Sequence, residues 1–240
     1  MQSANSDLQL WEVDLDQSPE WIEERSSSIL SADERSRSAE ADHVRRRRLV
    51  ARIALRIAVA QALDRAPGEL TFRRDSSGRP WLDSPDDARA PLHFNLARTG
   101  DCCLIAVSRA GSVGVDVEHV VAVPEVEAIV RTRFAHREAG EILTREGVDR
   151  LRAFFNCWTR KEAYLKARGV GLMAPLDRVV VTVGDEQPSF VSLYDDDPSA
   201  WSLFCVPLGP ERVGAVALRS VGRPGGAMLR PETLPLDGSG

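Results

Sequence analysis

The stretch Gly114-Val115-Asp116-Val117-Glu118 does most to decide the fold of this 240-residue chain. Side chains alternate between the two faces of a strand, so Asp116 and Glu118 share one face while Val115 and Val117 share the other. Two carboxylates on one face repel each other unless a cation lies between them, and hard oxygen ligands suit Mg²⁺. The same pattern also fits the solvent-facing side of a half-buried strand. Both interpretations predict a strand here.

The stretch from Trp158 to Lys166 reads Trp-Thr-Arg-Lys-Glu-Ala-Tyr-Leu-Lys. Its spacing places Trp158, Glu162 and Lys166 along one stripe of a helix. An ordinary surface pair would explain the Glu and the Lys, but Lys161 and Lys166 are the only lysines in the chain, and the other 29 of the 31 cationic residues are arginine. A lysine ammonium can release a proton or contact phosphate closely, whereas guanidinium stays charged. We therefore predict a chemical role for this helix.

Around these two stretches, periodic apolar segments and turn residues predict a mixed α+β fold. The expected helices are 32–41, 43–63, 126–143 and 151–167, and the expected strands are 8–15, 102–107, 113–117, 179–183, 190–193, 201–206 and 213–218. We expect 102–107 and 113–117 to form a hairpin, and residues 93–100 to form a polar turn. Strand, helices and further strands recur along the chain. This predicts two halves, 1–111 and 112–221, followed by a disordered Gly/Pro-rich tail at 222–240.

Composition narrows the class of protein. Hydrophobic residues make up 43% of the chain, which suits a sizeable core and argues against a disordered chain. The net charge of -5 does not suit a binder of nucleic acids. Apolar runs are too short to span a bilayer, and we expect a cytoplasmic protein with no membrane partner. The four cysteines lack metal-site or disulfide spacing, so we expect reduced thiols.

A stripe of arginines marks the second expected helix. Arg45, Arg48, Arg52 and Arg56 follow helical spacing, and Arg35 belongs to the preceding helix. Guanidinium groups bind phosphate oxygens in pairs, so this patch could bind a phosphorylated small molecule. The alternative is a solvated helix face whose arginines pair with nearby acids.

Taken in order, these segments resemble the Sfp-type 4′-phosphopantetheinyl transferases. The resemblance rests on the arginine helix, the Gly78-Arg79-Pro80 turn, the Phe94-Asn95 pair, the acid strand at 114–118, and residues 158–172 with their Lys-Glu-Ala core. It spans about 60% of the chain, and the last two segments in this order are far more specific than either alone. The resemblance implies a monomer of two pseudo-symmetric α+β halves, with the active site in the cleft between them.

The resemblance also implies roles for individual residues. Asp116, Glu118 and Glu162 match the magnesium-binding acids of the family, and Glu162 is also the expected general base, acting directly or through water. Lys166 is expected to contact the phosphates of coenzyme A and to assist departure of 3′,5′-ADP. The further residues expected to contact the coenzyme are Arg35, Arg47, Arg52, Arg79, Pro80, Asn95, Arg98, Thr99 and Lys161.

One position departs from the family pattern. The family has Ser-His-Ser where this chain has Ala97, Arg98 and Thr99. The family histidine contacts the 3′-phosphate of coenzyme A, and Arg98 would supply a permanent positive charge in its place.

The implied activity is the Mg²⁺-dependent transfer of 4′-phosphopantetheine from coenzyme A to a serine of an apo carrier protein, as in holo-[acyl-carrier-protein] synthases. Fatty-acid, polyketide and nonribosomal-peptide carriers remain open as partners, as do acyl-coenzyme A as substrate and Mn²⁺ as metal. Two alternatives also remain open: a metal-dependent nucleotide or coenzyme A phosphohydrolase, and a non-catalytic coenzyme A-binding protein.

Overall fold

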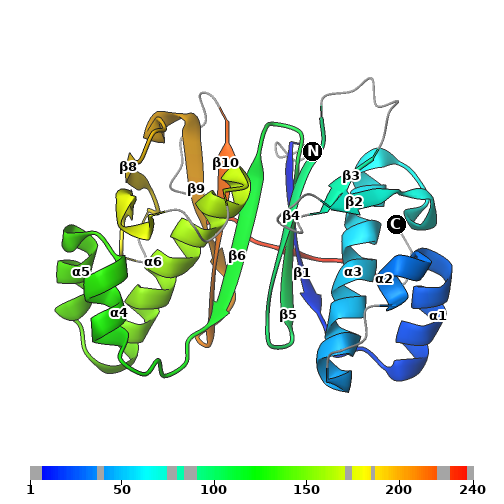
Figure 1. Cartoon of the computed structure of the whole chain (residues 1–240), viewed down its shortest axis with the longest axis horizontal. Helices are drawn as coiled ribbons and strands as arrows, with labels where there is room; N and C mark the ends of the chain where they lie inside the picture. Colours follow the sequence, from blue (N-terminus) through cyan, green and yellow to red (C-terminus); the bar gives the residue numbers. More distant parts are fainter. Residues whose placement is uncertain are drawn as a thin grey trace.

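The computed structural model describes residues 7–36, 41–74, 80–83, 91–170, 175–184, 187–220 and 228–236. The fold is a mixed α+β arrangement in which two sheets pack face to face and helices cover the outer face of each sheet (Figure 1). The first sheet has the strand order β11-β1-β5-β4, and the second has the order β6-β10-β9. The predicted α+β class is confirmed.

Elements of the first sheet and its helices come mainly from the N-terminal part of the chain. They are β1 (Leu8–Asp14), α1 (Pro19–Ile29), α2 (Ala32–Ser36), α3 (Asp42–Leu63), β4 (His93–Thr99) and β5 (Cys102–Ser108), with the small β2-β3 hairpin (Phe72–Arg74 and Pro80–Leu82) beside them. The last strand of this sheet is β11 (Glu232–Thr233), which pairs parallel with β1.

Elements of the second sheet and its helices follow. They are β6 (Val113–His119), α4 (Val126–Arg133), α5 (His136–Leu143), α6 (Gly147–Arg168), β9 (Trp201–Pro207) and β10 (Arg212–Arg219), with the small β7-β8 sheet (Val179–Val181 and Phe190–Leu193) at their side. None of the helices in the described parts of the chain is long and apolar enough to cross a bilayer.

The alternation of side chains along the strands explains which residues pack between the two sheets and which pack under the helices. Leu104 on β5 and Val115 on β6 belong to one apolar cluster between the two sheets. Their sequence neighbours point outward, and Ile105 joins the core under α3. A strand that is buried on both faces needs apolar residues at every position, which is why 102–107 carries no alternation.

Several expectations about elements are wrong. Residues 102–107 and 113–117 do not form a hairpin, because β5 pairs with β1 and β4, whereas β6 pairs with β10. The expected helix at 126–143 is two helices that are separated at Phe134 and Ala135. The expected turn at 93–100 is the strand β4.

Two further segments differ from expectation. Helix α1 was not expected, although Ser18 caps its N-terminus and Pro19 occupies its first turn, which is a recognisable start signal. The expected disorder of 222–240 is wrong for residues 228–236, because β11 pairs with β1 and Leu234 lies in the core under α3.

Candidate active site

The acid strand β6 faces helix α6 with its polar side. Val115 and Val117 point into the layer between the sheets, so Asp116 and Glu118 point the other way, as the alternation predicts. Gly114 brings the helix close: a Cβ atom there would lie 2.1 Å from the Ala163 carbonyl oxygen. The glycine of this motif is therefore required by the packing of α6 on β6.

Lys166 and Asp116 join the two elements. Lys166 Nζ donates to Asp116 Oδ1 at 2.6 Å and lies 3.4 Å from the carbonyl oxygen of Val115. Asp116 is only 5% exposed, and its second oxygen, Oδ2, is buried without a hydrogen-bond partner. The ammonium thus neutralises part of the acid cluster and leaves one carboxylate oxygen available.

Glu162 lies on the same helix, one turn before Lys166. Its side chain is 7% exposed, and Oε1 is buried without a hydrogen-bond partner. Burial raises the pKa of Glu162, and the charge of Asp116 raises it further, whereas Lys166 acts in the opposite direction. A carboxylate with a raised pKa and a bare oxygen is suited to accept a proton.

Glu118 completes the acid cluster. Its Oε2 accepts a long hydrogen bond from the Thr99 hydroxyl of β4, at 3.4 Å. Burial raises the pKa of Glu118, with a further contribution from Asp116. Burial likewise raises the pKa of Asp116, while Lys166 opposes the shift. The structure therefore brings together the three acids and the lysine that the sequence predicted.

The acid cluster fits a hard divalent cation. Across the described ranges, no three His, Cys, Asp or Glu side chains lie in an arrangement that could already hold a metal ion. However, Asp116 Oδ2 and Glu162 Oε1 are buried and unpartnered, and a buried carboxylate oxygen is costly unless something binds it. Oxygen ligands with incomplete protein coordination are what Mg²⁺ prefers.

Strand β4 separates residues that the sequence grouped together. Asn95 and Thr99 point toward β6, where Asn95 Oδ1 accepts the N–H of Val115 at 3.0 Å. Arg98 is exposed on the opposite face of β4, in register with Cys103 of the core under α3. The two faces exist because residues 93–99 form a strand and not a turn.

The arginines of α3 are mostly paired with acids. Arg47 makes two hydrogen bonds to the carboxylate of Asp16, at 2.7 and 2.8 Å, on a partly exposed surface. Arg52 Nε lies 2.9 Å from Glu34 Oε1 in a nearly buried ion pair. Arg35, which lies in α2, donates to the Ser27 carbonyl oxygen. The expected phosphate-binding stripe therefore also ties α3 to its neighbours.

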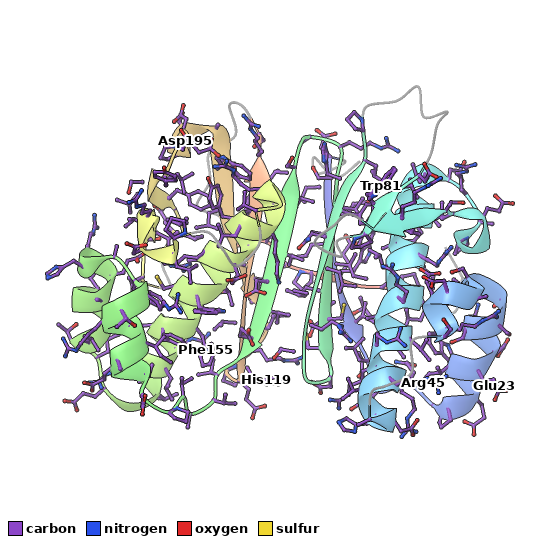
Figure 2. All side chains as sticks on the ribbon, viewed as in Figure 1. Glu23, Arg45, Trp81, His119, Phe155 and Asp195 are labelled. Carbon is purple, nitrogen blue, oxygen red and sulfur yellow. The ribbon has the colours of Figure 1, made fainter. Side chains whose placement is uncertain are left out.

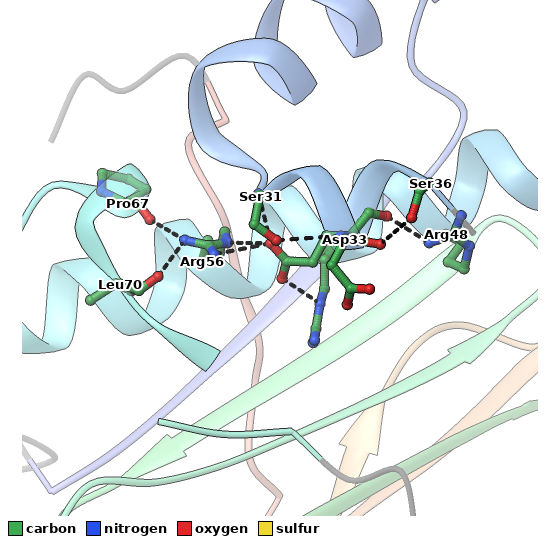
Figure 3. Close-up of polar contacts among 9 residues, drawn as sticks. Ser31, Asp33, Ser36, Arg48, Arg56, Pro67 and Leu70 are labelled. Atoms are coloured by element: carbon green, nitrogen blue, oxygen red, sulfur yellow. Dashed lines mark hydrogen bonds and ion pairs between the residues drawn. The ribbon is translucent and has the colours of Figure 1, made fainter. Parts of the chain in front are cut away.

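Glu34 is the centre of this network. It accepts the Ser31 N–H and donates its own N–H to Ser31 Oγ, which makes a capping box at the start of α2. It also pairs with Arg56, whose Nη1 donates to the carbonyl oxygens of Pro67 and Leu70 (Figure 3). Burial alone would raise the pKa of Glu34, but the hydrogen bonds from Ser31 and Arg56 outweigh it and hold this pKa below its ordinary value. Arg56 is thus a structural residue.

The expectation that Lys161 contacts the coenzyme is contradicted. Its side chain is 0% exposed, and Nζ donates to Glu138 Oε2 at 2.6 Å and to the carbonyl oxygens of Leu176 and Val179. All three of its donors are used inside the protein. No local pattern in the sequence marks Glu138 as the partner of Lys161, because the two residues are 23 positions apart and lie in different helices, α5 and α6.

Two other expected coenzyme contacts belong to the turn before β3. Arg79 lies outside the described residues. Pro80 is half-buried and opens β3, opposite Arg74 in the small hairpin. His119, which Figure 2 shows at the end of β6, lies 3.6 Å from Asp101, and the alternation of the strand turns it away from the side that carries Asp116 and Glu118.

Two family models match the chain, one in its N-terminal part and one in its C-terminal part. Residues 20–110 match a family model described as "4'-phosphopantetheinyl transferase, N-terminal", and residues 112–217 match "4'-phosphopantetheinyl transferase superfamily". The 4′-phosphopantetheinyl transferase HetI of Nostoc sp. is 30% identical over 221 residues, which cover 91% of this chain and 90% of HetI. The chain belongs to the 4′-phosphopantetheinyl transferase superfamily.

Other members are similar over much of their length. The transferase Sfp of Bacillus subtilis is 23% identical over 81% of this chain and 90% of Sfp. The transferase AcpT of Salmonella typhimurium is 30% identical over 59% of this chain and 67% of AcpT. Membership of the superfamily confirms the predicted resemblance.

Proposed function

We propose that this chain is a holo-[acyl-carrier-protein] synthase type enzyme, which transfers 4′-phosphopantetheine from coenzyme A to a serine hydroxyl of an apo carrier protein and releases 3′,5′-ADP. The observation that carries the proposal is the buried cluster of Asp116, Glu118 and Glu162 beside Lys166, with two unpartnered oxygens. Full-length similarity to named transferases supports the reaction class.

Glu162 is the proposed base. Its unpartnered Oε1 would accept the proton of the carrier serine, directly or through a water molecule, as the serine oxygen attacks the β-phosphate of coenzyme A. The raised pKa of Glu162 favours this transfer, because a base works best when its pKa approaches the working pH. Positioning and charge neutralisation would supply most of the lowering of the barrier.

Asp116, Glu118 and Glu162 are the proposed ligands of Mg²⁺. When bound, the metal would neutralise charge on the pyrophosphate of the coenzyme. Lys166 would contribute a second positive charge on the same side, and its bond to Asp116 keeps the ammonium in place before the substrate arrives. It would stabilise the departing 3′,5′-ADP.

Coenzyme binding is proposed for residues that can still reach solvent. Arg98 is exposed and would hold the 3′-phosphate, and Arg47 can exchange Asp16 for a phosphate at little cost because their pair is exposed. Arg52 is a weaker candidate, because leaving its nearly buried pair would strand Glu34. Arg35, Pro80 and Thr99 remain proposed contacts, and Arg79, which lies outside the described residues, remains one on the ground of the family resemblance alone.

The partners and setting form part of the proposal. We expect an acyl, peptidyl or aryl carrier protein, in fatty-acid, polyketide or nonribosomal-peptide biosynthesis, to be the acceptor. The site needs only one copy of the chain, because β4, β6 and α6 of the same chain form it, which supports a monomer. The four cysteines are free thiols, as expected in the cytoplasm.

Intact-protein mass spectrometry would test the proposal. Apo acyl, peptidyl and aryl carrier proteins would be incubated with the protein, coenzyme A and Mg²⁺, with EDTA as the metal-free control. We expect a gain of one phosphopantetheine group on at least one carrier, and its loss with EDTA. A matched variant, Glu141→Gln, alters an exposed acid paired with Arg137 and should keep full activity.

The same experiment separates the two alternatives. Consumption of coenzyme A without a carrier product would identify a phosphohydrolase. Binding of coenzyme A without consumption would identify a non-catalytic binding protein. Either result would overturn the proposed transfer.

A further inference from the structure

The two sheets meet along a pair of edge strands. β4 ends the first sheet and β6 ends the second, and the two strands lie side by side (Figure 1). Edge strands carry N–H and C=O groups that their own sheet does not pair. No ladder joins β4 to β6 within the described residues, so side chains must connect these edges.

Asn95 makes such a connection at the residue before Asp116. Its Oδ1 accepts the Val115 N–H at 3.0 Å, and the Val115 carbonyl oxygen lies 3.4 Å from Lys166 Nζ. In a strand, the N–H and C=O of one residue point to the same side. Both polar groups of Val115 therefore face away from β10 and are held by Asn95 and Lys166.

A second side-chain hydrogen bond also connects β4 to β6. The Thr99 hydroxyl of β4 donates to Glu118 Oε2, two residues along β6 from Asp116. Asn95 and Thr99 lie on the same face of β4. Asn95 bonds to β6 one residue before Asp116 and Thr99 bonds to it two residues after, so the two bonds lie on either side of Asp116. The acid strand is thus attached to the N-terminal half of the molecule at two points, and to α6 by Lys166.

We infer that Asn95 is a positioning residue, which fixes the edge of β6 so that Asp116 stays in place opposite Lys166. This assignment replaces the expected contact between Asn95 and coenzyme A. The effect of Asn95 on the reaction rate rests on the proposed transfer activity, whereas its hydrogen bond to Val115 does not depend on that activity. An amide suits this task because its carbonyl accepts the Val115 N–H without adding a fourth carboxylate to the cluster.

Amide hydrogen exchange of the Asn95→Ala variant tests the inference directly. Loss of the acceptor should speed exchange of the Val115 amide roughly two- to tenfold, as expected for one net hydrogen bond. The Leu104 and Ala215 amides, in the central strands of the two sheets, should stay protected. Unchanged exchange at Val115 would overturn the inference, whether or not the protein transfers phosphopantetheine.

Steady-state kinetics supplies the second readout. A positioning role predicts a kcat that falls roughly tenfold to a hundredfold, because small displacements at the reacting groups are costly, with an unchanged KM for coenzyme A. A raised KM with unchanged kcat would show that Asn95 is a coenzyme ligand and would overturn the inference. If the wild-type protein modifies no carrier, the proposed function fails, and the exchange experiment still decides the role of Asn95.

Leu96→Ala is the matched control. Leu96 lies next to Asn95 but points toward the core under α3. Its truncation should lower stability without selectively exposing the Val115 amide. Selective exposure of that amide in Leu96→Ala would mean that any damage to β4 loosens β6, and would overturn the specific role of Asn95.

Discussion

At Glu162, the burial that suits this carboxylate to accept a proton also lowers the stability of the folded protein. Burial raises its pKa, so the folded state holds a proton on this carboxylate more tightly than the unfolded state does. The free energy of unfolding therefore decreases as the pH rises from the ordinary carboxyl pKa through the raised one. Ionised Glu162 thus destabilises the metal-free protein at neutral pH.

Glu162→Gln should separate the two effects. The neutral isostere removes the buried charge, so we expect a gain of about 0.5–2 kcal/mol in unfolding free energy at pH 7 without metal, together with loss of transfer. The gain should shrink as the pH is lowered from 8 to 4, where wild-type Glu162 becomes protonated. Urea unfolding followed by tryptophan fluorescence measures it. A variant less stable than wild type at pH 7 would contradict this account.

Lys161 belongs to the interior, although it adjoins Glu162 in the sequence. We expect Lys161→Ala to destabilise the protein by about 3–5 kcal/mol, because Glu138 would keep an uncompensated buried charge. The double variant Lys161→Met with Glu138→Gln should recover part of this loss. Denaturant unfolding of wild type, Lys161→Met, Glu138→Gln and the double variant gives the coupling energy. A marked rise in KM for coenzyme A in folded Lys161→Ala would contradict this account and support the expected contact between Lys161 and the coenzyme.

Among the elements, the contact between β6 and α6 depends most on a single residue. Gly114→Ala would place its Cβ 2.1 Å from the Ala163 carbonyl oxygen and 2.4 Å from the Ala167 nitrogen. Since both are backbone atoms, α6 must move away from β6, and we expect a loss of at least about 1–3 kcal/mol with loss of activity.

Gly140→Ala is the matched control for this prediction. A Cβ at Gly140 in α5 would meet nothing within 4 Å, so the substitution should gain about 0.5–1 kcal/mol through helix propensity. Thermal unfolding compares the two variants. Equal melting temperatures for Gly114→Ala and wild type would show that the close approach does not restrict position 114.

The elements also show what the sequence could predict. Helices α3 and α6 were predictable because long periodic faces and the Gly169 stop are local signals, and the acid strand was predictable because alternation is local too. The partners of strands are not local. Nothing in 102–107 and 113–117 says that each will pair with a distant strand instead of with the other.

The site shows the same limit. The acids and Lys166 were predictable from motif spacing, but the buried partners of Lys161 and Arg52 were not, because an ion pair depends on tertiary contacts. Asn95 was expected among the coenzyme ligands, and only its position on a strand reveals that it bonds to Val115. Residue type indicated a polar role, and packing decided which one.

At the scale of the whole molecule, residues 228–236 link the two sheets. The Leu229 N–H donates to the Cys205 carbonyl oxygen of β9 in the second sheet. A few residues later, β11 pairs with β1 of the first sheet, and Leu234 is 3% exposed in the core under α3. This segment therefore bridges the same two halves that form the site.

Truncation should show that the bridge stabilises both halves. A chain that ends at residue 227 loses both the β11 pairing and the burial of Leu234, so we expect a loss of at least about 2–5 kcal/mol, the usual cost of removing a buried leucine side chain. A chain that ends at Leu236 keeps both and should match the full-length protein in urea unfolding. Leu234→Ala should reproduce much of the loss, at about 2–5 kcal/mol, whereas Thr233→Ala, an exposed position, should change stability by less than about 0.5 kcal/mol. If the chain ending at residue 227 unfolds at the same urea concentration as the full-length protein, the segment lies against the two sheets without holding them together.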